Sequence, residues 1–333
     1  MKKNKNAKKI WKIIGLLLVF IGLVSFLTLW YQVNRYEEVE IEKTNEALGI
    51  KEINVPVQIP DVIDVEGEEP LPILQVAIFG LDNRANETPR SDAILVAQFD
   101  QAADDVKIIS LMRDMDVRID GHGTDKLNHA YAYGGPQLAI KTINQNFGTA
   151  IKNYVAVDFK EMANAVDAIG GVTVNITSEE KTEINKNTNN KIGQLLNEGD
   201  VLLNGEQAVT YARIRSIDSD FKRTERQRNL MESLLTSIKG ADKLEFVQYW
   251  MKIAPNVELS MSKEELLDYG MAYVTGNYGF SEKRIPEDGH WSSGRKENGA
   301  WIMKVDESYV RDSIKHFFGP AKKPGLLGPQ DMR

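Results

Sequence analysis

Residues 73–112 read ILQVAIFGLDNRANETPRSDAILVAQFDQAADDVKIISLM, and this stretch decides the fold. It contains three short runs of apolar or β-branched residues, at 73–79, 93–99 and 106–112. Runs of this kind are typical of buried strands. Three of them in one short segment indicate that a sheet begins here.

Helices and strands alternate in the pattern that follows. PQLAIKTINQNFG (136–148) has apolar residues at helical spacing, with a proline at its start and a glycine at its end. YVAVDF then predicts a strand, KEMANAVDAIGG a helix and GVTVNI another strand. Further helices are expected in NGEQAVTYAR, TERQRNLMESLLTSIKG, 242–253, SKEELLDYGMAYV and DESYVRDSIKHFF, and further strands at 283–285 and 300–305. The sequence therefore predicts an α/β domain over residues 72–318, with a mixed central sheet flanked by helices on both sides.

The N-terminus carries a basic segment followed by an apolar one. Six lysines precede an uncharged run at 13–30, with aromatic residues at both of its ends. At about 1.5 Å rise per residue this run nearly crosses a hydrocarbon core about 30 Å thick. The alternative is a cleaved signal peptide, but no small-residue cleavage site follows the run. We expect a cytoplasmic tail (1–12), a retained single-pass transmembrane anchor (13–31), an acidic extracellular stalk (32–71) and a flexible C-terminal tail (319–333), which places the domain outside the cell membrane.

Charge and cysteine content exclude several classes of protein. Removing the six N-terminal lysines from a formal net charge of −7 leaves −13 for the remainder, so we expect no nucleic-acid partner. The chain has no cysteine, which excludes disulfides, thiol nucleophiles and Cys-ligated zinc. Sequence signatures of serine hydrolases, P-loop enzymes and zinc proteases are also absent.

Charged residues gather where the predicted strands end. Asp82 follows the first strand, Arg90 and Asp92 precede the second, and Arg113 follows the third. Binding sites of α/β folds collect at strand ends. Two carboxylates with oxygen-only ligation suit Mg²⁺, with Mn²⁺ as the alternative. Taken alone, Asp82 as a turn residue and Arg90–Asp92 as a surface pair is the more common outcome.

A dense basic segment, YARIRSIDSDFKRTERQRN (211–229), favours a binding site over this surface-pair interpretation. If TERQRNL is helical, Arg223, Arg226 and Gln227 share one face. Arg213 and Arg215 reach one site only if the chain there is extended or at a helix end. Clustered arginines repel unless they have a partner, and a phosphate group is such a partner. A solvated helix face with local acidic compensation is the competing interpretation.

TDKLNHAYAYGG (124–135) is the third informative segment. Its lone histidine, His129, is interpreted as a structural hydrogen-bonding residue and is assigned no role. Tyr131 and Tyr133 fit either a core or the lining of a groove.

These segments, in this order, resemble the LytR-CpsA-Psr family of cell-envelope phosphotransferases. The matching pieces are IFGLDNR, PRSDAILVAQFD, IISLMRDMDVRI, TDKLNHAYAYGG, VAVDFKEMANAVDAIGGVTV, LNGEQAVTYARIRS and DSDFKRTERQRN. The resemblance implies a Mg²⁺-dependent enzyme that moves a glycopolymer, teichoic acid or capsular polysaccharide, from a polyprenyl-pyrophosphate lipid to a hydroxyl of peptidoglycan through a phosphodiester. It also implies that apolar residues of the central helices enclose the polyprenyl tail.

Site residues follow from the same resemblance. It makes Asp82 and Asp92 the metal-associated carboxylates, and it makes Asp92, Asp82 and Arg113 the catalytic group, with Asp92 as the first candidate for the base. The expected pyrophosphate ligands are Arg90, Arg113, Arg213, Arg215, Arg223 and Gln227. The sequence departs from the family at Met112, where proline is usual, and at Lys222, where glycine is usual; Lys222 is expected to add charge and bulk beside the site. A pyrophosphatase that transfers to water and a lipid-binding regulator without turnover remain alternatives.

Overall fold

The computed structural model describes residues 38–51, 72–82, 88–188, 193–254 and 257–319. The predicted cytoplasmic tail and transmembrane anchor lie outside the described residues, as do most of the predicted stalk and of the C-terminal tail. In the part of the chain that is described, no helix has both the length and the apolar character needed to cross a membrane.

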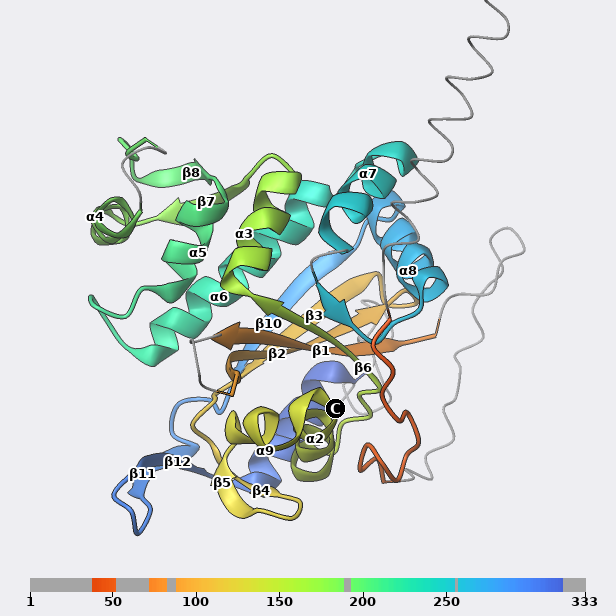
Figure 1. Ribbon diagram of the computed structural model, residues 1–333, viewed down its shortest axis with the longest axis vertical. Coiled ribbons are helices and arrows are strands. Elements are labelled where there is room, and N and C mark those ends of the chain that lie inside the picture. Colours follow the sequence, from red (N-terminus) through yellow and green to blue (C-terminus); the bar gives the residue numbers. More distant parts are fainter. Residues whose placement is uncertain (1–37, 52–71, 83–87, 189–192, 255–256, 320–333) are drawn as a thin grey trace, which may run out of the picture.

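A six-stranded mixed sheet forms the centre of the molecule, in the order β10-β3-β2-β1-β6-β9 (Figure 1). β2 runs antiparallel to both β1 and β3, whereas β1 pairs parallel with β6 and β3 pairs parallel with β10. The three strands predicted from residues 73–112 are thus neighbours in the sheet. The strands are β1 (Leu74–Asp82), β2 (Arg90–Asp100), β3 (Asp105–Leu111), β6 (Asn153–Asp158), β9 (Glu258–Leu259) and β10 (Gly279–Ile285).

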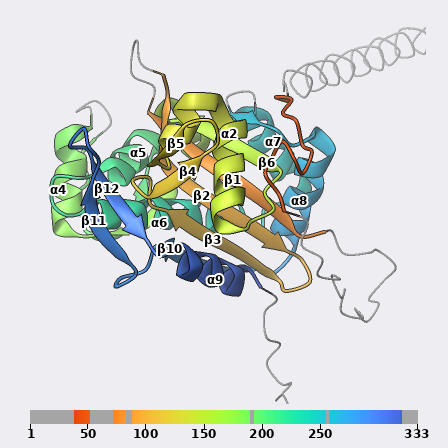
Figure 2. The same ribbon diagram turned by 90° about the horizontal axis from the view of Figure 1, so that it is seen from below.

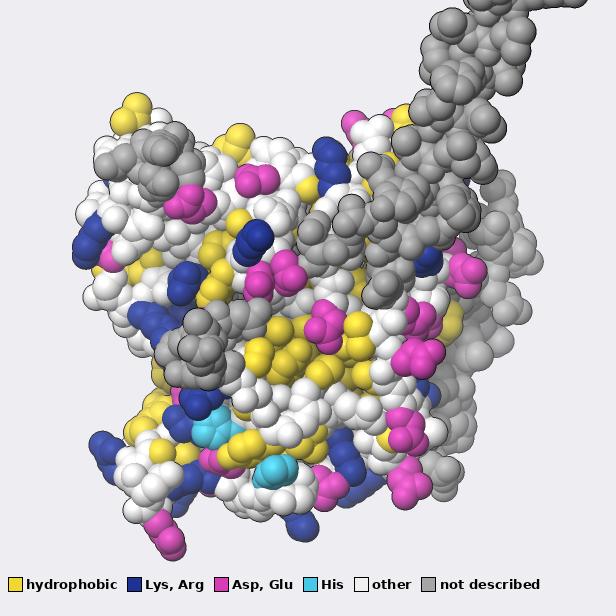
Figure 3. All heavy atoms as spheres, viewed as in Figure 1, with side chains coloured by type: hydrophobic (Ala, Val, Ile, Leu, Met, Phe, Trp, Pro, Cys, Tyr) yellow, Lys and Arg dark blue, Asp and Glu magenta, His cyan; other side chains and the backbone are white. Residues whose placement is uncertain are grey.

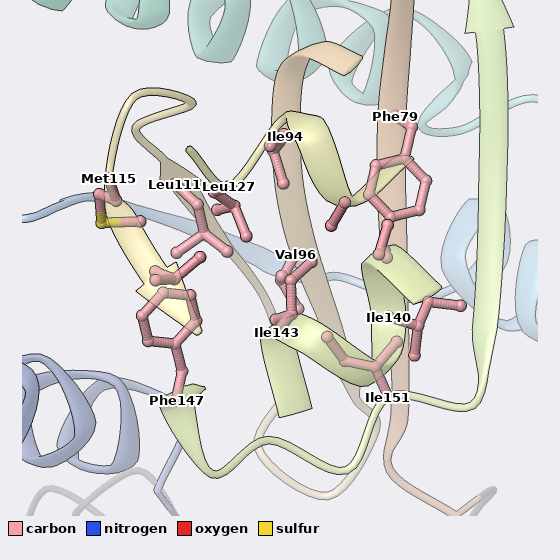
Figure 4. Close-up of a cluster of buried hydrophobic side chains, with 14 of the residues drawn as sticks. Phe79, Ile94, Val96, Leu111, Met115, Leu127, Ile140, Ile143, Phe147 and Ile151 are labelled. Carbon is pink, nitrogen blue, oxygen red and sulfur yellow. The ribbon is translucent and has the colours of Figure 1, made fainter. Parts of the chain in front are cut away.

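Helices cover both faces of this sheet, as the sequence predicts (Figures 1 and 2). Successive strand residues point to opposite faces, so each strand contributes to two cores. Ile109 and Leu111 of β3 pack in the core beneath α2 (His129–Phe147) and α9 (Glu307–Phe318). Ile108, the residue before Ile109, belongs to the core on the other face, with residues of α6 (Asp220–Ile238) and α8 (Lys263–Thr275). Figure 4 shows the first of these cores around Phe79, Ile94, Val96 and Ile143.

A second group of elements extends the domain beside the sheet. The antiparallel hairpin β7 (Val172–Ile176) and β8 (Gly199–Leu203) packs with α3 (Phe159–Ala168), α4 (Ser178–Asn187), α5 (Gly205–Arg213) and α6 around an apolar cluster of its own. Gly205 allows α5 to lie close to α3, because a Cβ at this position would be 2.1 Å from the backbone oxygen of Ala163. This close contact fixes α5, whose last residue is Arg213, relative to α3.

The sequence prediction missed several short elements. These are α4, β4 (Asp116–Ile119), β5 (Gly123–Lys126), β8, β9 and β11 (Trp291–Arg295), most of which are brief or carry little apolar character. α2 begins at His129, ahead of the predicted start at residue 136, and is kinked at Gly134 and Gly135. The remaining elements, α7 (Lys243–Ile253) and β12 (Trp301–Val305), lie where the sequence indicates.

Residues 38–51 were expected in a stalk, but they lie against the domain. Leu48 is fully buried in the core that contains α2. Its carbonyl oxygen accepts a 2.9 Å hydrogen bond from Asn144 Nδ2, and the Val39 backbone N–H donates to the Leu259 oxygen at 3.0 Å. This part of the chain is therefore held by the domain and does not act as a free spacer.

Candidate functional site

Two adjoining cavities collect every site residue predicted from the sequence. The first, of about 230 Å³, is lined by Asp82, Arg90, Asp92, Arg113 and Arg215 among others. The second, of about 170 Å³, shares Asp82, Asp92 and Arg215 with the first and adds Arg213, Arg223 and Gln227. The strand ends, the end of α5 and the first turns of α6 therefore face one polar site, as the sequence predicts.

The pairing of β1 with β2 brings the two carboxylates to this site. Asp82 is opposite Arg90 in the antiparallel ladder. Gly80 is opposite Ala93 and Leu81 is opposite Ser91, so Asp92 is the extra residue of a β-bulge. Bulges redirect side chains and are frequent beside active sites. Here the bulge lets Asp92 line the same cavity as Asp82 and Arg90.

Asp92 is held between two arginines. Arg113 Nη1 donates to Asp92 Oδ1 at 2.7 Å, and Arg215 Nη2 donates to Asp92 Oδ2 at 3.2 Å. The carboxylate therefore sets the spacing between a residue that follows β3 and a residue that follows α5. An anionic ligand in the cavity would meet both guanidinium groups already in position, which lowers the ordering cost of binding.

Arg223 is the most deeply buried cation of the site. Its side chain is 2% exposed, and it contacts Asp220 Oδ1 at 2.7 Å and Oδ2 at 2.9 Å. Its Nε has no hydrogen-bond partner among the described residues. Burial and the nearby charges of Arg113 and Arg215 lower the pKa of Arg223 to about 10. A buried guanidinium with an unpaired donor beside two other arginines is a strong site for an anion.

Arg213, Arg215 and Gln227 occupy the place where two helices meet. α5 ends at Arg213 and the chain is extended at Ile214, as the sequence requires if both arginines are to serve one site. The guanidinium of Arg213 lies over the Phe159 ring, 4.0 Å from its centroid. Oε1 of Gln227 is buried and has no partner among the described residues, so this amide is available to a ligand.

An apolar hollow adjoins the polar cavities. It has a volume of about 70 Å³, and its lining residues come from β1, β2, β6, α3, α5 and α6. It shares Gly80, Ala93, Phe159, Ala212, Arg213 and Gln227 with the second polar cavity. The rest of its lining is largely apolar and includes Ile78, Leu95, Met162, Val209 and Leu230. Figure 3 shows an exposed hydrophobic area over β1 and β6 on this side of the molecule, with basic side chains beside it.

Electrostatics keep Asp92 ionised. Burial alone would raise its pKa, but the charges of Arg113, Arg215 and Arg223 and the Arg113 hydrogen bond outweigh burial and lower the pKa below its ordinary value. An aspartate with a lowered pKa is a weak proton acceptor. The structure therefore favours Asp92 as the residue that orients the arginines over Asp92 as the base.

This lowered pKa predicts a pH-dependent contribution to stability. A carboxylate whose folded-state pKa is depressed stabilises the fold above its unfolded pKa, about 3.9, and loses that contribution as the pH falls through its folded-state pKa. We expect Asp92→Asn to unfold about 1–3 kcal/mol more easily than the parent at pH 7, and the gap to close below pH of about 4. Urea midpoints measured across this pH range check the prediction, and parallel curves would contradict it.

The donor set is compatible with Mg²⁺ only in combination with a ligand. Asp82 and Asp92 line one cavity, but among the described residues no group of three or more acidic or histidine side chains is placed to hold a metal. Mg²⁺ is commonly bound by one or two carboxylates together with substrate phosphates. The two aspartates fit that mode, with phosphate oxygens completing the coordination.

Several residues that line the first cavity were not predicted from the sequence. Thr88, Asp114, Lys126, Asn128 and His129 also line the first cavity. Lys126 Nζ, on β5, donates a 2.6 Å hydrogen bond to Asp114 Oδ1, which belongs to the residue after Arg113. The one sequence signal for these lining residues was the position of TDKLNH between two other segments that match the family.

Three residues differ from the sequence-based expectation. Arg226 points away from the cavities and pairs with Glu180 and Asp218. Lys222, expected to add charge beside the site, pairs with Glu225 at 2.9 Å and does not line the described cavities. Met112 donates its backbone N–H to the Ile285 oxygen at 2.9 Å, a bond that proline would remove.

Comparisons with known proteins identify relatives of the chain. The chain matches the model of the LytR_cpsA_psr family over residues 32–316. A relative from Bacillus cereus, named polyisoprenyl-teichoic acid–peptidoglycan teichoic acid transferase TagU, is 28% identical over 319 residues, which cover 93% of this chain and 95% of the relative. A relative of the same name from Bacillus mycoides is 30% identical over 254 residues, covering 74% and 78% of the two chains.

Solved structures show the same fold. TagT bound to LIIa-WTA superposes with a TM-score of 0.62 at 25% identity, covering 74% of this chain and 89% of TagT. Bacillus subtilis TagV also gives a TM-score of 0.62, at 22% identity, over 75% of this chain and 98% of TagV. TagT with bound octaprenyl pyrophosphate lipid gives 0.58 at 22% identity, over 74% and 90% of the two chains.

Proposed function

The chain belongs to the LytR-CpsA-Psr family, and from this premise we propose that it is a membrane-anchored phosphotransferase of the cell envelope. Its substrate is a glycopolymer carried on a polyprenyl-pyrophosphate lipid, and its acceptor is a hydroxyl of peptidoglycan. The names of the relatives favour teichoic acid over capsular polysaccharide as the glycopolymer. The anchor is the apolar run at 13–31, and the domain acts outside the cell membrane.

One observation carries this proposal: the arginine-lined cavities continue into an apolar hollow. A polyprenyl pyrophosphate has the same two parts, a strongly anionic head and an apolar tail. Arg90, Arg113, Arg213, Arg215 and Arg223 supply the positive charge, and Gln227 lines both the polar and the apolar parts. The hollow between α3, α5 and α6 accepts the first part of the lipid tail.

The residues present can perform a phosphoryl transfer. The acceptor oxygen forms a bond to the phosphorus that bears the glycopolymer, and the bond from that phosphorus to the bridging oxygen breaks. The products are a phosphodiester to peptidoglycan and polyprenyl phosphate. Arg113 and Arg223, fixed by Asp92 and Asp220, neutralise the charge that develops on the leaving phosphate.

Asp82 and Asp92 would hold Mg²⁺, or Mn²⁺, together with the pyrophosphate. When bound, the ion would supply positive charge to the phosphate groups. Asp92 has a second role, because both of its oxygens accept bonds from arginines. Asp82, the last residue of β1, is the other carboxylate that lines this cavity.

The metal assignment predicts a cation-dependent affinity. We expect the full chain in detergent to bind a polyprenyl pyrophosphate about tenfold more tightly with Mg²⁺ than with chelator, because an ion held by Asp82 would neutralise part of the charge of the lipid phosphates. Asp82→Asn should lose most of that difference. A labelled-lipid binding assay measures both constants, with polyprenyl monophosphate as the weaker competitor. Equal affinities with and without Mg²⁺ would show that the metal takes no part in lipid binding.

Two alternatives use the same cavity. A pyrophosphatase would release polyprenyl phosphate and leave the glycopolymer unattached. A regulator without turnover would bind the lipid and release nothing. The acidic pair beside the arginines favours catalysis over plain binding, because extra carboxylates weaken anion binding unless a cation joins them.

A further inference from the structure

A second cluster of polar side chains lies at one edge of the first cavity, on β5 and the first turns of α2. Asp125 Oδ2 is 2.8 Å from His129 Nδ1 and accepts a 2.7 Å hydrogen bond from the Tyr133 hydroxyl. Asp125 Oδ1 lies 3.2 Å from Lys296 Nζ, which comes from the connection between β11 and β12. The Asp125 carboxylate is thus fixed by three side chains from two segments, α2 and the β11–β12 connection.

This arrangement determines the tautomer of His129. Burial raises the pKa of Asp125, but hydrogen bonds from His129, Tyr133 and other donors outweigh it and lower the pKa below its ordinary value. An ionised carboxylate only accepts hydrogen bonds. His129 Nδ1 therefore carries a hydrogen, and in the neutral ring Nε2 is the acceptor nitrogen.

His129 also lines the cavity that we propose binds the substrate. Its side chain is 25% exposed and lines the same cavity as Arg90, Arg113 and Arg215. No protein partner is recorded for Nε2 among the described residues. A histidine whose Nδ1–H is bonded to a partly buried carboxylate and whose ring lines a substrate cavity is the arrangement of a general base.

We propose that His129, oriented by Asp125, accepts the proton of the attacking hydroxyl. This inference rests on the proposed phosphotransferase function and assigns its base. As the acceptor oxygen bonds to phosphorus, its proton passes to Nε2, and the electron pair of the breaking bond stays on the polyprenyl phosphate. Asp125 stabilises the imidazolium, which then returns the proton to solvent or to the leaving phosphate. Asp92, occupied by two arginines, is not needed for this step.

The test compares kcat and KM for release of polyprenyl phosphate by the full chain. We expect His129→Gln to lower kcat by about 10²-fold or more while KM for the lipid changes little, because a general base contributes to the transition state only. Added imidazole should restore part of the rate of His129→Ala, whose shorter side chain leaves room for it. His316→Gln is the matched control: His316 is exposed on α9 and does not line the described cavities, so its rate should stay within about twofold.

Asp125→Asn separates positioning from a purely structural effect. The asparagine fits the same space, and we expect about tenfold loss of kcat, less than for His129→Gln and without rescue by imidazole. A kcat for His129→Gln within threefold of the parent, or a loss in folded His129→Ala that imidazole does not restore, would overturn the proposal.

The outcome also distinguishes this inference from the proposed function. If the parent releases polyprenyl phosphate without attachment to peptidoglycan, the ligase function is wrong. Water is then the attacking group in place of the sugar hydroxyl, and the rate of His129→Gln still shows whether His129 is the base. If the parent binds the lipid and never releases the phosphate, both the function and the base are wrong.

Discussion

Arg113→Ala should lower kcat/KM for transfer by about 10³-fold, because one guanidinium serves the whole polar site. Arg113 lies 2.7 Å from Asp92, 3.4 Å from Asp114 and 3.8 Å from Asp220, so its loss removes a charge from the cavity and releases the Asp92 side chain. Among the described residues, Asp92 would then keep only Arg215 as a side-chain hydrogen-bond partner.

Steady-state kinetics of the full chain, with lipid-linked glycopolymer and peptidoglycan, measure this effect. Arg118→Ala is the matched control, because Arg118 lies on β4 with an exposed side chain and does not line the described cavities. We expect the control to stay within twofold of the parent. A rate for folded Arg113→Ala within a few-fold of the parent would show that the arginine cluster is not the catalytic charge.

Arg226→Met should destabilise the protein by about 3–5 kcal/mol, the cost of leaving a buried charge without its partner. Arg226 is 3% exposed; its Nε donates to Glu180 Oε1 at 2.6 Å, and it also pairs with Asp218. Glu180 lies on α4 and is itself buried, so the variant leaves its carboxylate with the Thr177 backbone N–H as its remaining hydrogen-bond donor among the described residues.

The effect should appear as a lower urea midpoint. The double variant Arg226→Met, Glu180→Gln should recover part of the loss, because it removes the stranded charge. Arg226 Nη1 also donates to the Ile214 carbonyl at 3.2 Å, so we expect the single variant to loosen the segment that carries Arg213 and Arg215. An unchanged midpoint for the single variant would refute the structural role given to this arginine.

Much of the fold could be predicted because its strong elements follow simple periodicity. The runs within 73–112 became three adjacent strands, and the helical spacing of 136–148 became the main part of α2. The first turn of α2 was not predicted because Gly134 and Pro136 normally end a helix, whereas here the chain only kinks. β9, two residues long, carries no periodic signal.

The main residues of the site were predicted from the sequence, but the contacts between them were not. Strand ends indicated that Asp82, Arg90, Asp92 and Arg113 would meet, and all four line one cavity. Spacing alone could not separate Arg223, which faces the site, from Arg226, which pairs with Glu180, because both lie on one helix within a single turn. Likewise the contact between Asp125 and His129 requires β5 to be placed before α2, and no sequence signal predicted β5.

Transfer itself tests the central claim most directly. The full chain in detergent or vesicles is incubated with a polyprenyl-pyrophosphate-linked teichoic acid precursor, peptidoglycan and Mg²⁺, and mass spectrometry follows both the glycan attached to peptidoglycan and the polyprenyl phosphate released. We predict equal amounts of the two products, joined by a phosphodiester and lost in Arg113→Ala. Release of polyprenyl phosphate without attachment, or lipid binding without release, would contradict the assignment as a glycopolymer transferase.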